Sequence, residues 1–285
     1  MHAVEHGVRL LDTADAYGGG RNEELVGDVL AAMGVKPLVA TKFGWVLNDH
    51  GAPVHLDSSP ARVRLACEAS LRRLRVERID LYLQHRVDPL VPIEETAGEV
   101  ARLVDEGKVA EFGLSEASVT TVRRAHAVLN VAALQSEYSL FWREPEVELI
   151  PVCDELGIAF IAYSPLGRGL LTGALELGGA DVRGLLPRFS AENLRHNLAL
   201  SDSLSEIARR ERCTVGQLAL AWLLNRHGHV IPIPGTRSVA HLEENLAAAT
   251  LKLRAEAIAE IEAAMPLGSG AGRRHTEQHL PTIDR

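Results

Sequence analysis

Short apolar runs alternate with amphipathic helical patterns from one end of this chain to the other. The apolar runs are rich in Val, Ile and Leu, which is typical of strands buried on both faces of a parallel sheet. The runs occupy residues 9–13, 38–41, 81–84, 111–114, 133–135, 159–163 and 230–233. Strands that alternate with helices predict a parallel sheet covered by helices.

Local signals predict where helices between the strands begin and end. Ser59 followed by Pro60 is a cap followed by proline at the first helical position. Asn22, followed by two acidic residues, predicts the start of an earlier helix. Gly107 and Gly157 lie where helices are expected to end.

Two architectures fit this alternation: an open doubly wound sheet and a closed eight-fold barrel. A barrel collects its site from the carboxyl ends of most strands, whereas an open sheet collects it at one switch point. Each predicted strand is followed by a polar or glycine-rich feature, namely Asp12 with Tyr17, Lys42, His85, Ser115, Gln135, Tyr163 with Ser164, and Gly235 with Thr236 and Arg237. Any one of these would more often be an ordinary loop or core group, but their recurrence favours the (β/α)8 TIM barrel.

Only seven strands are found, and a barrel of this type needs eight. Gly7 resembles the end of a helix, so the missing first strand is expected before Met1. The fold prediction is therefore an α/β barrel that is N-terminally truncated. Residues 1–285 are expected to form a single domain, with about 268–285 as a loose C-terminal tail.

Composition narrows the classes of partner. The net charge is −8, and acidic and basic residues are interspersed, so no basic face is expected to attract nucleic acid or anionic lipid. No apolar run approaches the roughly 18 to 20 residues of a spanning helix. The first residues, MHAVEHG, lack the regions of a signal peptide, which predicts a cytoplasmic protein.

Four polar residues predict proton-transfer chemistry. The phenol of Tyr17 is protonated at neutral pH and can donate a proton to a carbonyl oxygen. Lys42, at the end of the next strand, would stabilise the tyrosinate that remains, and Asp12 would hold that lysine. His85 would orient the carbonyl. Asp12 and Tyr17 would thus serve one reaction from the end of one strand.

The candidates for anion binding lie late in the chain. No GxGxxG follows an early strand, so a Rossmann site is not expected. YSPLGRG at 163–169 and GTRS at 235–238 each follow a predicted strand, and glycine allows close approach to a phosphate. Phosphate sites in barrels commonly lie near the loops after the last two strands.

Seven motifs together resemble the aldo-keto reductase superfamily, in its bacterial and plant branch related to potassium-channel beta subunits. In chain order they are DTADAYGGGRNEELVG, VATKFG, DLYLQH, GKVAEFGLSEAS, LQSEYSL, IAYSPLGRGLLTG and IPIPGTRSVAHLEEN. The resemblance runs from about residue 3 to about 250. It implies an eight-stranded barrel that binds NADPH/NADP⁺ in extended form and uses no metal.

The resemblance also implies a role for individual positions. Tyr17 would be the general acid, supported by Lys42 and Asp12, with His85 orienting the carbonyl. The implied cofactor contacts are Ser115 and Gln135 on the carboxamide, Tyr163 stacked on the nicotinamide, Ser164, Leu166 and Gly167 in the pyrophosphate loop, and Gly235, Thr236, Arg237, Glu244 and Asn245 towards the adenosine end. A guanidinium at Arg237 suits a 2′-phosphate, which favours NADPH over NADH.

Some positions depart from the family or admit a second interpretation. Glu116 occupies a position that is asparagine in many animal members, and Gly235 and His241 replace a lysine and an arginine that are common in those members. Three aromatic residues are expected in loops at the catalytic face: Trp45, Phe141 and Trp142. They either form an apolar wall for the substrate or only pack against neighbouring loops. Asp49, His50, His55 and Asp57 crowd one polar loop without metal-ligand spacing, so no metal is expected.

The leading hypothesis is an NADPH-dependent reductase of small aldehydes or ketones. The alternative is an NADPH-binding regulatory or accessory subunit with little turnover. A metal-dependent barrel hydrolase that uses Asp12 and His85 ranks far behind both. The natural substrate and the oligomeric state are left open.

Overall fold

The computed structural model describes residues 1–34, 37–173, 175, 177–178, 181–278 and 280–284. The chain divides into two compact units, residues 1–135 with 282–285, and residues 136–281. The single domain expected from the sequence stays a prediction.

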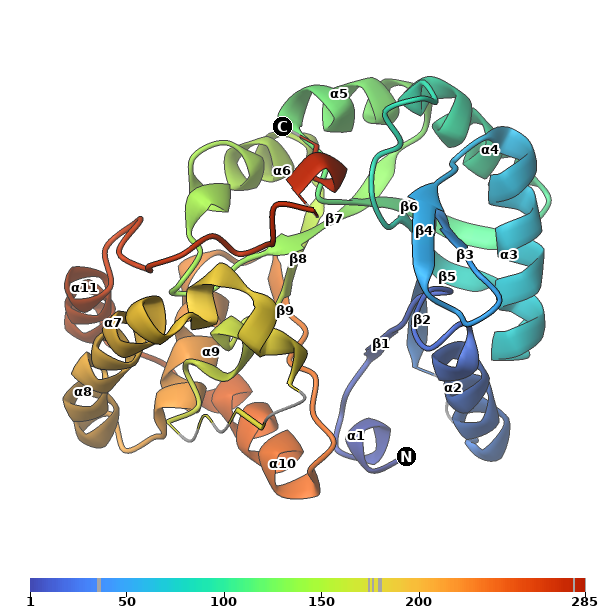
Figure 1. Cartoon of the computed structure of the whole chain (residues 1–285). Coiled ribbons are helices and arrows are strands. Elements are labelled where there is room, and N and C mark those ends of the chain that lie inside the picture. Colours follow the sequence, from blue (N-terminus) through green and yellow to red (C-terminus); the bar gives the residue numbers. More distant parts are fainter. Residues whose placement is uncertain (35–36, 174, 176, 179–180, 279, 285) are drawn as a thin grey trace. The chain divides into compact units, whose positions relative to one another are not determined.

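The seven apolar runs are seven strands of one sheet (Figure 1). They are β1 (Leu10–Asp12), β2 (Leu38–Phe43), β5 (Ile79–Gln84), β6 (Val109–Ser115), β7 (Val131–Glu137), β8 (Ala159–Tyr163) and β9 (Val230–Pro232), in the order β1-β2-β5-β6-β7-β8-β9. The pairings β1·β2, β2·β5, β5·β6, β6·β7 and β8·β9 are parallel. The predicted parallel α/β sheet is confirmed. The first strand expected before Met1 and the closed barrel stay predictions.

Helices of the first unit connect its strands, and one short helix precedes β1. They are α1 (His2–Glu5), α2 (Arg21–Ala32), α3 (Pro60–Leu74), α4 (Ile93–Asp105) and α5 (Val119–Val128), with α2 packed on α3, α3 on α4 and α4 on α5. Ser59 is the N-cap of α3, as predicted. Helix α2 begins at Arg21 instead of after Asn22, because Gly20 at φ 89° forms its cap and Asn22 accepts a 2.7 Å hydrogen bond from Thr13.

An antiparallel hairpin, β3 (Trp45–Leu47) with β4 (Pro53–Leu56), follows β2 and was not predicted. Trp45 was expected in a loop but lies in β3, where it pairs with Leu56. His55 pairs with Val46 in the same hairpin. The strands are only three and four residues long, and the second is largely exposed. Their apolar pattern is therefore too short to stand out from a loop.

Helices also dominate the second unit. The α-helices are α6 (Leu149–Leu156), α7 (Ala191–Ser203), α8 (Ser205–Arg210), α9 (Val215–Arg226), α10 (Val239–Ala247) and α11 (Ala255–Ala264). Helix α6 ends at Gly157 in the left-handed conformation, as predicted. Helix α9 begins with a capping box in which Thr214 and Gln217 bond to each other's backbone N–H. No helix within the described residues has the length and apolar character needed to cross a membrane.

The C-terminal segment has more anchoring contacts than its sequence indicates. In the second unit, the side chain of Asn197 accepts from the backbone N–H of Ala271 at 2.8 Å and donates to its carbonyl oxygen at 3.0 Å. His275 is buried. In the first unit, Oδ2 of Asp284 accepts hydrogen bonds of 2.9 Å from both the backbone N–H and the hydroxyl of Ser118, the N-cap residue of α5.

Candidate functional site

Lys42 is the centre of a polar cluster in the first unit. Its side chain is fully buried, and its ammonium donates to Oδ1 of Asp12 at 2.5 Å and to the carbonyl oxygen of Thr13 at 2.8 Å. A third, longer contact of 3.3 Å joins the ammonium to the hydroxyl oxygen of Tyr17. The structure thus brings together three of the four residues expected to carry the chemistry.

Strand register explains why these side chains meet. Asp12 pairs with Ala40 of β2, and Lys42 follows two residues later, so its side chain points to the same face as that of Ala40. The ladder continues past the end of β1, since the backbone N–H groups of Thr13 and Asp15 donate to the carbonyl oxygens of Ala40 and Lys42. The chain then turns and leaves Tyr17 41% exposed. The hydroxyl that contacts buried Lys42 therefore belongs to a ring that solvent reaches.

His85 lies beside Tyr17 at the end of β5. Its backbone N–H donates to the carbonyl oxygen of Phe43 at 2.8 Å, and the two rings meet edge to face with centroids 5.8 Å apart. Burial, and then the positive charges of Lys42 and Arg86, hold the pKa of His85 well below its usual value. Its imidazole is therefore neutral at physiological pH. Within the described residues its buried Nδ1 has no hydrogen-bond partner.

Gln135 and Ser115 end two neighbouring strands and pair in register across β6 and β7. The side-chain amide of Gln135 donates to Oδ2 of Asp12 at 2.7 Å, so Gln135 joins the cluster around Lys42. The hydroxyl of Ser115 accepts a 3.4 Å hydrogen bond from Arg86. Their expected hydrogen bonds to a cofactor carboxamide stay predictions.

Sequence reasoning missed a second group of buried charged residues in the first unit, near the cluster around Lys42. Glu23 is fully buried on α2 and accepts hydrogen bonds of 2.6 Å from the hydroxyl of Thr41 and from the guanidinium of Arg73. Asp15 is 7% exposed, and its Oδ1 has no partner in the described part of the chain. The only sequence signal was DTADAY itself, where an acidic residue at position 15 lies between two catalytic candidates.

The loop after β8 in the second unit carries the predicted pyrophosphate residues. Ser164, Gly167 and Arg168 all have positive φ, of 49°, 59° and 59°. A Cβ atom at Gly167 would lie 2.9 Å from the ring of Phe141, so this position requires glycine both for its backbone and for space. The hydroxyl of Tyr163 accepts a 3.2 Å hydrogen bond from Arg274. Leu166 closes the turn, because its carbonyl oxygen accepts from the N–H of Gly169.

The predicted adenosine-end residues lie immediately before α10 and in its last turn. Gly235, Thr236 and Arg237 are exposed immediately before the helix. Glu244 accepts a 2.5 Å hydrogen bond from Thr214 at the start of α9, and Asn245 lies in the last turn of α10. A guanidinium at an exposed helix N-terminus suits a phosphate group.

The three aromatic residues expected to line a substrate pocket have different surroundings. Phe141 is 4% exposed and packs against the glycine loop and Gly270 of its own unit. The guanidinium of Arg274 lies 4.9 Å from the ring centre of Trp142. Trp45 is half-buried in the hairpin. Packing within the unit accounts for Phe141, whereas the substrate-wall role of all three stays a prediction.

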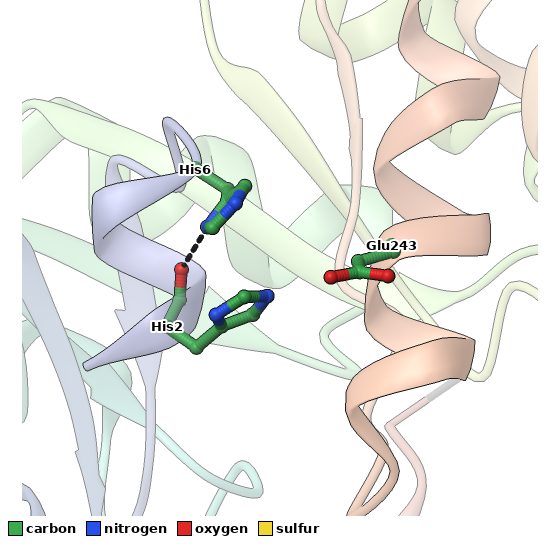
Figure 2. A group of neighbouring side chains, drawn as sticks. All are labelled: His2, His6 and Glu243. Carbon is green, nitrogen blue, oxygen red and sulfur yellow. Dashed lines mark hydrogen bonds between the residues drawn. The ribbon is translucent and has the colours of Figure 1, made fainter.

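Two histidines lie close together at α1, His2 within the helix and His6 as its C-cap residue, outside all predicted sites (Figure 2). Nδ1 of His6 donates to the carbonyl oxygen of His2 at 2.8 Å, and the ring centroids are 3.9 Å apart. Glu243, also drawn in Figure 2, belongs to α10 of the second unit. Two imidazoles are fewer than the three protein ligands of a catalytic zinc site, so we assign no metal to this pair.

Comparison with known proteins agrees with these features. The model of the Aldo/keto reductase family matches residues 1–266. A probable aldo-keto reductase 1 from Glycine max is 45% identical over 279 residues, which cover 96% of this chain and 80% of that protein. The solved glycerol dehydrogenase from Gluconobacter oxydans has a TM-score of 0.87 and 33% identity, and covers 96% of this chain and 86% of its own.

A second solved structure adds a bound cofactor. It is an aldo/keto reductase from Klebsiella pneumoniae in complex with NADP and acetate, with a TM-score of 0.74, 28% identity and coverage of 96% of this chain and 86% of that one. The family model covers most of the sequence, and the curated relative and the Klebsiella pneumoniae structure carry the same family description. This chain belongs to the aldo/keto reductase family.

Proposed function

We propose that this chain reduces aldehydes or ketones with NADPH, and that Tyr17 donates the proton to the carbonyl oxygen. The observation that carries the proposal is the buried ammonium of Lys42, which contacts both Asp12 and the hydroxyl oxygen of Tyr17. Because that oxygen accepts from Lys42, its own proton is directed elsewhere and is available to a substrate. The ammonium then stabilises the tyrosinate after the proton has left.

The neutral imidazole of His85 has a role beside this donor. A neutral ring donates one hydrogen bond and adds no second positive charge near Lys42. Its edge-to-face contact with Tyr17 fixes the position of the ring. We infer that His85 orients the carbonyl oxygen towards the Tyr17 hydroxyl.

The chemistry of the donor set in the second unit suits NADPH. Arg237 and the N-terminus of α10 offer positive charge, and the glycine loop after β8 has backbone at positive φ. Bound NADPH would supply the hydride, and the chain's residues would supply orientation and the proton. Relatives of known structure were crystallised with NADP or NADPH.

Steady-state oxidation of NADPH with a panel of small aldehydes tests the proposal. Tyr17→Phe should lower kcat by about 10²- to 10⁴-fold, the usual contribution of a general acid, and leave the affinity for NADPH nearly intact. Tyr82→Phe is the matched control: it also removes one hydroxyl from the first unit, at a buried site where that hydroxyl donates a 3.3 Å hydrogen bond to the carbonyl oxygen of Val63. Undiminished turnover in Tyr17→Phe would disprove the role of Tyr17.

The accessory-subunit alternative requires the same residues but predicts tight NADPH binding without turnover. The same assay, combined with a fluorescence titration of NADPH, separates the two functions. Cytoplasmic localisation stays a prediction.

A further inference from the structure

Gln135 makes a contact that its place in the sheet would not suggest. Strands β1 and β7 are four positions apart in the sheet order, which in a flat sheet corresponds to about 19 Å. Nevertheless Nε2 of Gln135 lies 2.7 Å from Oδ2 of Asp12. The strands of the first unit must therefore curve, so that their ends face one another across the concave side.

Both oxygens of Asp12 are occupied as a result. Oδ1 accepts from Lys42 at 2.5 Å, and Oδ2 accepts from Gln135. Gln135 is 3% exposed, so this amide donor is shielded from competing water. A carboxylate held at both oxygens has one orientation, and that orientation keeps the lysine where it contacts Tyr17.

We propose that Gln135 is a positioning residue for the proton donor: by holding Asp12, it keeps the Lys42 ammonium aligned on the hydroxyl of Tyr17. This role is additional to the carboxamide contact that family resemblance implies for Gln135. It rests on the proposed function only in that Tyr17 is the residue that gives up the proton.

The direction of the effect follows from charge sharing. The amide N–H stabilises negative charge on Oδ2, so Asp12 neutralises the ammonium less completely. More of the positive potential of Lys42 then acts on the oxygen of Tyr17, 3.3 Å away. Without the amide, Asp12 is free to rotate and to pair more fully with Lys42, and the tyrosinate loses stabilisation.

The chain has four tyrosines, which makes this effect visible without substrate or cofactor. Burial raises the pKa of Tyr82 and of Tyr138 well above the usual value for a phenol. An alkaline titration of tyrosinate absorbance near 295 nm follows the ionisation of the tyrosines directly. Subtracting the titration of Tyr17→Phe isolates Tyr17.

The experiment compares Gln135→Met, which keeps the shape but removes the donor, with the parent protein. The midpoint of Tyr17 ionisation should rise by about half a pH unit or more, and kcat should fall about tenfold, as expected from the loss of a hydrogen bond to a charged group. Ser115→Ala is the matched control. Ser115 pairs with Gln135 across the strands and has the same implied carboxamide role, but its hydroxyl accepts from Arg86 and does not hold Asp12. It should weaken NADPH binding and leave the midpoint of Tyr17 ionisation unchanged.

Gln135→Glu supplies a second variant of nearly identical size. An ionised Glu at this position would repel Asp12, whereas a protonated one would restore the hydrogen bond. Its kcat relative to the parent should therefore recover as the pH is lowered from 8 to 6, a response that loss of packing alone would not give.

The outcomes separate this proposal from the proposed function. The positioning role would be overturned if Gln135→Met left the midpoint of Tyr17 ionisation unchanged and raised only the KM for NADPH. It would also be overturned if the kcat of Gln135→Glu, relative to the parent, stayed constant between pH 8 and pH 6. If Gln135→Met shifts the midpoint but Tyr17→Phe still turns over, the positioning of Tyr17 is supported and the general-acid function fails. If Gln135→Met does not fold, the pH dependence of kcat in Gln135→Glu alone tests the positioning role.

Discussion

Asp15 gives the most sharply defined prediction, because the structure buries this carboxyl without fully compensating its negative charge. The side chain is 7% exposed, and no described residue bonds to its Oδ1. Burial, followed by the negative charge of Glu23, raises its pKa from 3.8 to about 7. Arg73, the backbone N–H of Ala16 and Arg62 act in the opposite direction but do not cancel the shift.

The sign of the resulting pH dependence is fixed by that shift. In the unfolded chain Asp15 ionises near 3.8, whereas in the folded chain it keeps its proton to about pH 7. Ionisation therefore favours the unfolded state, and the native protein loses stability as pH rises from about 4 to about 7. The full shift is 7 − 3.8 = 3.2 units, or about 4 kcal/mol. About 2.5 kcal/mol of this falls between pH 5 and pH 8.

Asp15→Asn removes the titration and retains the shape. Its free energy of unfolding, measured by urea denaturation followed by circular dichroism, should therefore rise relative to the parent by about 2.5 kcal/mol between pH 5 and pH 8. Subtracting the parent curve cancels the contribution of all other titrating groups. A difference between variant and parent that stays flat over this range would refute the reasoning.

Asp57→Asn is the matched control with the opposite sign. The hydrogen bond to Ser59 lowers the pKa of Asp57 from 3.8, so its ionised form stabilises the fold. That contribution is fully present above pH 4 and is lost only as pH falls through the lowered pKa. Asp57→Asn should therefore destabilise the protein by a constant amount between pH 5 and pH 8.

Further predictions concern packing, the buried ion pair and the pH profile. Gly27→Ala should lower the free energy of unfolding by about 1 to 3 kcal/mol, because the added Cβ would lie 2.4 Å from a backbone carbonyl oxygen near the end of α3. Gly98→Ala in α4 meets nothing within 4 Å and should raise the free energy of unfolding by about 0.5 to 1 kcal/mol. Thermal unfolding measures both changes. Lys42→Met should cost about 3 kcal/mol by removing the ion-pair partner of Asp12, and adding Asp12→Asn should recover part of that loss in a double-mutant cycle. His85→Gln should lower kcat but keep the shape of the pH–kcat profile between pH 6.5 and 7.5, because the pKa of the parent imidazole lies well below this range. A change in the shape of the profile over that range would contradict a neutral His85.

The pairing of Asp12 with Lys42 was predictable because it depends on one local rule. The two residues end neighbouring parallel strands, and the apolar runs before them were long enough to recognise. The contact of Asp12 with Gln135 depends on how far the sheet curves between β1 and β7, and residue spacing does not encode curvature. Sequence reasoning therefore placed Gln135 on the correct strand end but did not find its partner.

The buried charges behind the site were missed for a related reason. Glu23 and Arg73 are 50 residues apart on different helices, and each alone has the pattern of an ordinary surface position. Their meeting requires α2 to pack against α3, which follows from tertiary structure and not from either helix alone. The hairpin of β3 and β4 was missed because its strands are too short for a period of two to be recognised.

The attachment of Asp284 to the cap of α5 has a practical consequence for handling this protein. Its carboxylate accepts from the backbone and the hydroxyl of Ser118, a residue 166 positions earlier in the chain. Deletion of the final residues, or a purification tag fused there without a spacer, would perturb the start of an internal helix. Versions of this protein made for expression should therefore keep Asp284 and separate it from any fusion by a flexible linker.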